Sequence, residues 1–176
     1  MHFALNDEQI ALAESAKRFL GEHASFEKNL TAMQTEQGFD PDVWTMLTQE
    51  LGWTALTIPE AYGGYGLSQI DLAALMEEMG RHLLCAPFFS AVCLGANALL
   101  VAGTESQKQT YLPEIAAGPR RATLALVEKD NHWKPAGVNT VALPVDGGFE
   151  LTGTKSMVID GHTADTLIIV ARKPSS

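Results

Sequence analysis

The chain has 176 residues, which allows one sizeable domain, or one domain and part of another. Apolar residues make up 46% and charged residues 19%, a composition that argues against disorder and favours a globular protein with a core. The formal net charge is −9 and the densest basic spots are only Arg120-Arg121 and Arg172-Lys173, so we do not expect nucleic acid as a partner. No cluster of His, Cys, Asp and Glu has the spacing of metal ligands, and we expect no metal site.

Two helices are expected in the first fifty residues. Asn6 and Gln9 have the spacing of a capping box, and the apolar stripe that follows predicts a helix over 7–20. Residues 22–38 are polar and mixed, and we assign no element to them. Asp40-Pro41 places a capping side chain before a proline at the first helical position, which predicts a second helix up to residue 51.

The stretch "IPEAYGGYGLS", residues 58–68, contains three glycines and has two interpretations. A loop that binds phosphate needs a preceding strand and a helix whose N-terminus faces the anion. Here the glycines follow a helix, and no Lys-Ser/Thr pair comes after them. We therefore predict a packed corner, in which Pro59 sets the turn while Gly63 and Gly64 supply positive φ and close packing.

A third helix is predicted from the cap at Ser68 to about Arg81, with Glu77 and Glu78 mostly outward. Residues 83–103 carry no formal charge and are long enough to span a bilayer. Pro87 near the start and polar or small residues inside favour instead a buried helix over about 87–102, so we expect no membrane contact. Cys85 and Cys93 would lie roughly 12 Å apart along such a helix, too far for a disulfide.

A last helix is predicted after the capping box of Thr104 and Gln107, with Pro113 bending or restarting it. The character then changes, because runs 122–128, 137–145, 148–159 and 165–172 are rich in strand-forming residues. The predicted fold is mainly α: a helical domain over 1–119 is followed by an incomplete antiparallel β-domain over 120–176. Such a small sheet leaves an uncovered edge, which we expect to pair with another copy or another chain.

Three stretches resemble one known family. "GFDPDVWTMLTQELGWTALTIPEAYGGYGLSQIDLAALMEEMGR" resembles the N-terminal helical domain of acyl-CoA dehydrogenases, with its Pro-Glu-x-x-Gly-Gly-x-Gly corner and a helix ending in Glu-Glu-x-Gly. "AGTESQKQTYLPEIAAGPRRATLALVE" resembles the block that leads into the first strand of the middle β-domain. "FELTGTKSMVIDGHTAD" resembles the strand pair that follows. The resemblance covers nearly the whole chain in the family's order.

The resemblance implies a flavoenzyme that removes two hydrogens from the α and β carbons of an acyl-CoA thioester. It implies FAD as cofactor, acyl-CoA as substrate, electron-transfer flavoprotein or a similar acceptor as partner, and a homo- or hetero-oligomer. The family's catalytic glutamate belongs to a C-terminal helical domain that has no counterpart in these residues. We therefore assign no catalytic residue to this chain, and promote none of its glutamates. The resemblance places the cofactor against Leu124, Leu126, Val127, Met157 and Ile159.

Two flavin motifs depart from the family's pattern. The family's Thr-Glu-Pro motif keeps its glutamate as Glu128, but Val127 replaces the threonine and Lys129 the proline. His132-Trp133 replace the Gly-Ser that follows, and Trp133 obstructs the usual approach of the phosphates. Met157 and Ile159 replace the tryptophan and threonine that usually back the flavin. Both also alternate as the core residues of a strand would. We expect this chain alone to hold no stable FAD and to show no turnover.

These departures leave a second class of function open, which is a non-catalytic assembly subunit or a fragment of a heteromeric acyl-CoA dehydrogenase. Diverged flavin motifs beside an intact helical domain resemble the partner subunits of heteromeric dehydrogenases that handle bulky, steroid-like acyl groups. The N-terminus shows no pattern of a signal or transit peptide, and two separated cysteines are typical of a reducing compartment, so we expect the cytoplasm.

Overall fold

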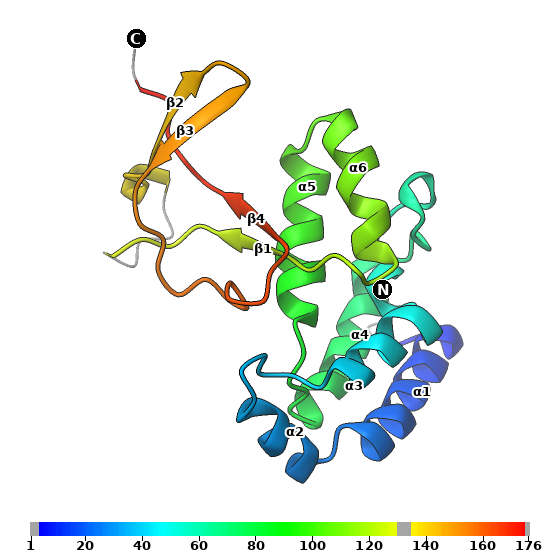
Figure 1. Cartoon of the computed structure of the whole chain (residues 1–176). Coiled ribbons are helices and arrows are strands. Elements are labelled where there is room, and N and C mark those ends of the chain that lie inside the picture. The colour runs from blue at the N-terminus through cyan, green and yellow to red at the C-terminus, as the bar shows by residue number, and fades with distance from the viewer. Residues whose placement is uncertain (1–3, 130–134, 175–176) are drawn as a thin grey trace.

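The computed structural model describes residues 4–129 and 135–174, and Figure 1 shows helices packed together with short strands at one side. The helices in chain order are α1 (Asp7–His23), α2 (Phe26–Met33), α3 (Pro41–Thr45), α4 (Gln69–Arg81), α5 (Asn97–Ala102) and α6 (Glu105–Ala116). The strands are β1 (Ala122–Ala125), β2 (Val141–Val145), β3 (Gly148–Thr152) and β4 (Thr166–Ile169). The predicted mainly helical fold with a small β part is confirmed.

The helix starts follow the predicted caps. The side chains of Asn6, Ser68 and Thr104 each accept a hydrogen bond from the backbone N–H of the third helical residue. The side-chain oxygen of that residue accepts one from the backbone N–H of the cap. Asp40 caps α3, which continues through a π-helical turn, Met46–Glu50. Pro113 lies inside α6 without ending it. α2 is the helix that the sequence interpretation left unassigned, and Ser25 caps it.

The uncharged stretch forms one helical run, consisting of the π-helical element η4 (Phe89–Ala96) and α5. Ala91 and Val92 of this run are buried in one apolar core and Ala96 and Leu99 in another, as predicted for a buried helix. Within the described ranges no helix is both long and apolar enough to cross a membrane. Cys93 lies in η4 and Cys85 before it, and both thiols are free, as the spacing predicted.

Two apolar cores hold the helices together. The first joins α1, α3, α4 and η4 around Leu20, Leu47 and Leu75. The second joins α5, α6 and β1 around Leu112 and Ile115. The prediction that Glu78 faces outward is wrong: its side chain is buried beside the first core, with Arg81 Nε at 3.3 Å from its Oε1.

The glycine stretch is the packed corner that the sequence predicted. Gly63 has φ of +82°, and a Cβ on Gly64 would lie 1.8 Å from the carbonyl oxygen of Ile58. The N–H groups of Tyr65 and Leu67 donate to the carbonyls of Ala55 and Leu56, each at 2.9 Å. The N–H groups of the corner therefore bond to the chain that precedes it rather than converging on a ligand.

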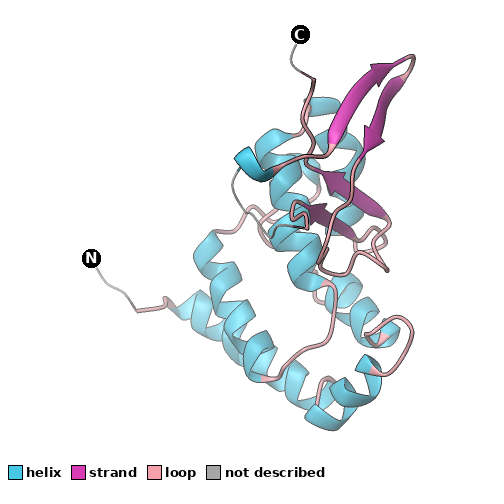
Figure 2. Cartoon of the chain, turned by 90° about the vertical axis from the view of Figure 1, so that its left-hand side faces the viewer, coloured by secondary structure: helices cyan, strands magenta, loops and turns pink. Residues whose placement is uncertain are grey.

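The strands form two pairs rather than one antiparallel sheet. β2 and β3 pair antiparallel, as predicted, with Val141 opposite Thr152. β1 and β4 pair in parallel, with Ala122 opposite Thr166, so the antiparallel prediction is wrong for these two strands. β1 and β4 lie against the helices, while the β2–β3 hairpin extends beyond them (Figure 1), and Figure 2 shows the strands gathered at one end of the molecule.

Candidate flavin-binding site

One apolar hollow lies between the helical run and the strands. Its walls come from η4, from the end of β1 and the residues after it, and from the loop that connects β3 to β4. The hollow measures about 480 Å³ including its open mouth, and its lining residues are Phe89, Leu94, Leu124, Leu126, Val127, Ser156, Met157, Val158 and Ile159. We call it the β1–η4 hollow. All five residues that the sequence proposed for the cofactor lie on it.

Close backbone approach brings the two main walls together. A Cβ on Gly95 would lie 2.6 Å from the Cβ of Ala122, so only glycine allows β1 to pack this closely on η4. The side chain of Ala122 is buried at this contact. The small residue in η4 therefore sets the distance between the helical wall, with Phe89 and Leu94, and the strand wall, with Leu124.

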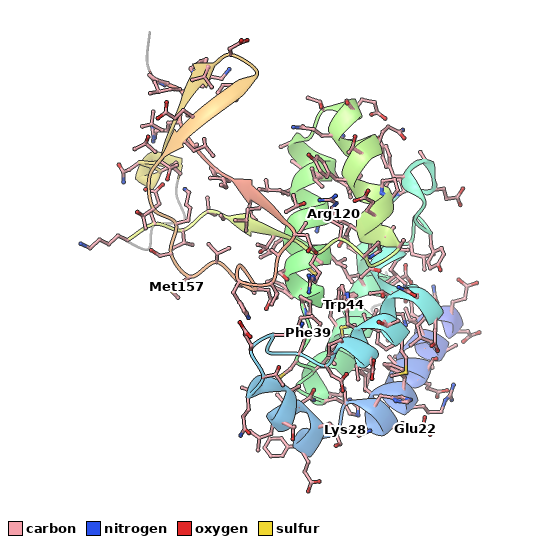
Figure 3. All side chains as sticks on the ribbon, in the orientation of Figure 1. Glu22, Lys28, Phe39, Trp44, Arg120 and Met157 are labelled. Atoms are coloured by element: carbon pink, nitrogen blue, oxygen red, sulfur yellow. The ribbon has the colours of Figure 1, made fainter. Side chains whose placement is uncertain are left out.

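The loop that carries Met157 and Ile159 is bound to β1 and to the segment that follows it. The Ser156 N–H donates to the Val127 carbonyl at 2.8 Å. The buried Thr123 hydroxyl donates to the Ile159 carbonyl, also at 2.8 Å. These bonds fix both ends of the segment, and Met157 lies between them on the loop between β3 and β4 (Figure 3).

Met157 and Ile159 are not core residues of a strand. β3 ends at Thr152, and Met157 has φ of +52°, which interrupts any regular alternation. The Met157 residue is 78% exposed and Ile159 is also exposed. The strand interpretation is therefore wrong, and both side chains lie at the edge of the hollow.

Glu128 lies beside the hollow but does not line it. Its carboxylate accepts hydrogen bonds from the Asn139 N–H at 2.8 Å, from the Thr140 N–H at 2.9 Å, and from the Thr140 hydroxyl at 2.7 Å. The ammonium of Lys155 donates to it at 2.8 Å, and both side chains are buried. Lys155 above all, and then Thr140, hold the pKa of Glu128 far below its ordinary value. A carboxylate bound in this way is a structural anion and no proton acceptor.

The acidic residues near the end of the loop are also paired. Asp165 receives two side-chain hydrogen bonds from Arg121, each at 3.0 Å, which hold the pKa of its carboxyl below the ordinary range. Asp160 accepts a bond from Ser90. Asp160 and His162 lie in turns, as predicted for this stretch. In the described ranges no group of three or more His, Cys, Asp and Glu residues has metal-binding geometry.

Sequence reasoning missed the helical wall. Phe89 and Leu94 were assigned only to a buried helix, although Phe89 is exposed. Periodicity does not identify such residues, because a helix apolar on all sides offers no preferred face. His132 and Trp133 lie outside the described residues, so their effect on the phosphates stays a prediction.

The lining residues suit a flat apolar ring. None of the nine carries a charged side chain, so the hollow offers contact and exclusion of water rather than acid–base chemistry. An isoalloxazine ring requires such a face together with polar groups at its edge. Within the described residues, the edge groups available are the Ser156 hydroxyl and backbone amides.

Comparison with known proteins identifies the class. The family described as "Acyl-CoA dehydrogenase, N-terminal domain" matches residues 6–119. The chain therefore belongs to the acyl-CoA dehydrogenase family, as the three sequence blocks predicted.

Similar proteins extend far beyond this chain. The human mitochondrial very long-chain specific acyl-CoA dehydrogenase is 32% identical over 178 residues, which cover 97% of this chain and 26% of the human protein. The ChsE4-ChsE5 complex from Mycobacterium tuberculosis has a TM-score of 0.86 at 25% identity, covering 98% of this chain and 46% of that one. An acyl-CoA dehydrogenase complexed with FAD from Bacillus anthracis has a TM-score of 0.84 at 26% identity, covering 96% and 29%. The chain thus spans less than half the length of these relatives.

Proposed function

We propose that this chain supplies part of an FAD-dependent dehydrogenase that oxidises the α and β carbons of an acyl-CoA thioester. The observation that carries the proposal is the β1–η4 hollow, on which all five proposed cofactor residues lie together. The same proposal divides the chain into a helical domain over 1–119 and the first part of a β-domain over 120–176.

The residues of the hollow would hold the flavin ring. Leu124, Leu126 and Met157 offer apolar contact to its face or edge, and Phe89 approaches from η4. The backbone N–H of Val127 is available as a donor, because no described residue accepts a hydrogen bond from it. When bound, FAD supplies a hydride acceptor. The chain's own contribution is to orient that ring and to exclude water from one side of it.

The proton acceptor for the α carbon would come from polypeptide beyond the described residues. No carboxylate lines the hollow, and Glu128 already accepts four hydrogen bonds. We therefore propose that no catalytic residue lies in this chain, and that the 176 residues alone bind FAD weakly and turn over no substrate. Half of a site gives few contacts for the affinity that retains a cofactor through purification.

A non-catalytic assembly subunit is the alternative function. It is favoured by the replacement of the family's tryptophan and threonine by Met157 and Ile159, which removes an aromatic surface and a hydroxyl from the edge of the hollow. The ChsE4-ChsE5 complex from Mycobacterium tuberculosis is among the solved structures that this chain resembles. A heteromer with a partner that carries complete flavin motifs would account for both features.

The proposal also includes the partners and the location. Acyl-CoA is the substrate class and an electron-transfer flavoprotein or similar acceptor takes the electrons. The exposed apolar residues of the β2–β3 hairpin support assembly with another copy or another chain. Two free thiols support a cytoplasmic location.

Purification and reconstitution test these alternatives. We expect the purified chain to lack the visible absorbance of stoichiometric flavin, and to bind added FAD with a dissociation constant of about 10 µM or weaker, or about 7 kcal/mol at most. Co-expression with the product of the neighbouring gene is expected to give a yellow complex that oxidises acyl-CoA with ferricenium as acceptor. A stoichiometrically yellow 176-residue chain would contradict the half-site proposal. A yellow complex without dehydrogenase activity would favour the assembly subunit.

A further inference from the structure

Among the described residues, one hydrogen bond joins the helical wall of the hollow to the loop that carries Met157 and Ile159. Ser90 lies on η4, next to Phe89, and is only 1% exposed. Its Oγ lies 2.5 Å from Oδ2 of Asp160, the residue that follows Ile159. No motif predicted this contact, because the two residues are separated by 70 positions in the sequence.

The Ser90 hydroxyl proton has two acceptors within reach. Its Oγ lies 3.0 Å from the Pro87 carbonyl oxygen within its own helical run, and closer to the carboxylate. A hydroxyl has one proton to donate, and a bond to an ionised acceptor is both shorter and stronger than a bond to a neutral carbonyl. The proton therefore belongs to the bond that crosses to the loop.

Asp160 holds an unfavourable backbone conformation at this point. Its φ is +52°, a left-handed conformation that is unfavourable for an ordinary residue and that Asn and Asp tolerate best. The neighbouring Ile159 carbonyl is held by Thr123, and Ser156 is held by Val127. The segment 156–160 is thus attached to the strand side at two points and to η4 at one.

We propose that Ser90 and Asp160 are a positioning pair that fixes the loop wall of the β1–η4 hollow against its helical wall. The proposal rests on the proposed flavin site and names residues that act through Met157 and Ile159. Ser90 and Asp160 do not touch the ring themselves. Loss of their bond lets the segment 156–160 move away from η4 and opens the hollow to water.

Four variants separate the hydrogen bond from the backbone conformation. Ser90→Ala removes the donor, and Asp160→Ala removes the acceptor. Asp160→Gly removes the acceptor while relieving the positive φ. Asp160→Asn keeps an amide oxygen that accepts the bond and a side chain that tolerates this φ, so it is the conservative control.

Two measurements are made on each variant after circular dichroism has verified its fold. Hydrogen exchange reports opening of the backbone amides over 156–161, and flavin fluorescence during titration with FAD reports the hollow. We expect about tenfold faster exchange and about tenfold weaker FAD binding in Ser90→Ala, Asp160→Ala and Asp160→Gly, since a bond to a charged group contributes about 1.5 kcal/mol or more. Asp160→Asn keeps an acceptor but not the charge, and is expected to lie between the wild type and these variants in both measurements.

The outcomes distinguish this proposal from the proposed function. Unchanged exchange in Ser90→Ala, or wild-type behaviour of Asp160→Gly, overturns the role of the bond. Faster exchange with unchanged FAD affinity overturns the positioning role. If the variants exchange faster but the wild-type chain binds no FAD at all, the proposed flavin site is overturned. The role of the bond between η4 and the loop is then still supported.

Discussion

The helical region, residues 4–119, and the strand region, residues 120–129 and 135–174, differ in how far they bury their apolar side chains. In the helical region, Leu20, Leu47 and Leu75 meet in a core that excludes water completely. In the β region, most large apolar side chains of the strands face solvent, with Leu143, Phe149 and Leu151 among them. The helical region therefore completes its own core, whereas the strand region has apolar surface that requires further polypeptide to cover it.

The same change, leucine to alanine, at one buried and one exposed position tests this contrast and gives the largest expected effect. Leu75→Ala, at 0% exposure, is expected to lower the free energy of unfolding by about 2–5 kcal/mol, through lost burial and the cavity left behind. Leu151→Ala, at 46% exposure, is expected to change it by about 0.5 kcal/mol or less. Urea denaturation followed by circular dichroism measures both. Equal losses would contradict the difference between the two regions.

A second prediction sharpens the account of the helical region. Gly64→Ala places a Cβ against the Ile58 carbonyl and is expected to destabilise the chain by about 1–3 kcal/mol or more. Gly80→Ala is the matched control, because a Cβ there meets no atom within 4 Å and the residue lies within α4. The control is expected to stabilise by about 0.5–1 kcal/mol, since alanine favours a helix over glycine. Thermal or urea denaturation measures the change in stability of both variants, which is expected to be opposite in sign. A Gly64→Ala variant as stable as the wild type would rule out the tight corner.

Local chemistry made most of the helical region predictable. Capping residues such as Asn6, Ser68 and Thr104 start helices through bonds to residues only three positions away. The exception is α2, whose apolar residues Phe26, Leu30 and Met33 are exposed rather than buried. A short helix that buries Asn29 and Ala32 instead gives no amphipathic signal that a sequence reader would recognise.

The strand region was less predictable because its order depends on distant residues. The parallel pairing of β1 with β4 joins residues 44 positions apart, beginning at Ala122 and Thr166, with no helical crossover to indicate it. The alternation of Met157 and Ile159 suggested a strand. Met157 and Asp160 instead have positive φ, in a segment held by hydrogen bonds from the distant Ser90 and Thr123. The five residues proposed for the cofactor nevertheless line one hollow, because motif order carries spatial information that periodicity does not.

A third prediction concerns pH and the ion pair inside the strand region. The folded-state pKa of Glu128 is lowered, so its contribution to stability is present above the ordinary value of 4.5 and is lost as the pH falls below it toward the folded value. We expect the protection of amides 126–128 and 138–140 to fall as the pH drops below that value, measured by hydrogen exchange.

Variants of the pair assign that pH dependence. Glu128→Gln is expected to reduce protection at neutral pH and to flatten its dependence on acid, because Lys155 is left buried without its carboxylate. Adding Lys155→Met to Glu128→Gln is expected to recover part of the loss. An unchanged acid response in Glu128→Gln would assign the effect to another group, with the Arg121–Asp165 pair as the next candidate.

Titration of FAD into the chain and two Met157 variants tests the flavin site most directly. Met157 is 78% exposed at the edge of the hollow, so neither substitution removes a buried side chain, and circular dichroism verifies the fold of each variant. We expect weak, saturable quenching of flavin fluorescence by the wild type. Met157→Trp, which restores the family's aromatic residue, is expected to bind about tenfold more tightly, and Met157→Glu about tenfold less tightly. The same affinity in all three chains, or no saturable binding by any of them, would contradict a flavin site at the β1–η4 hollow.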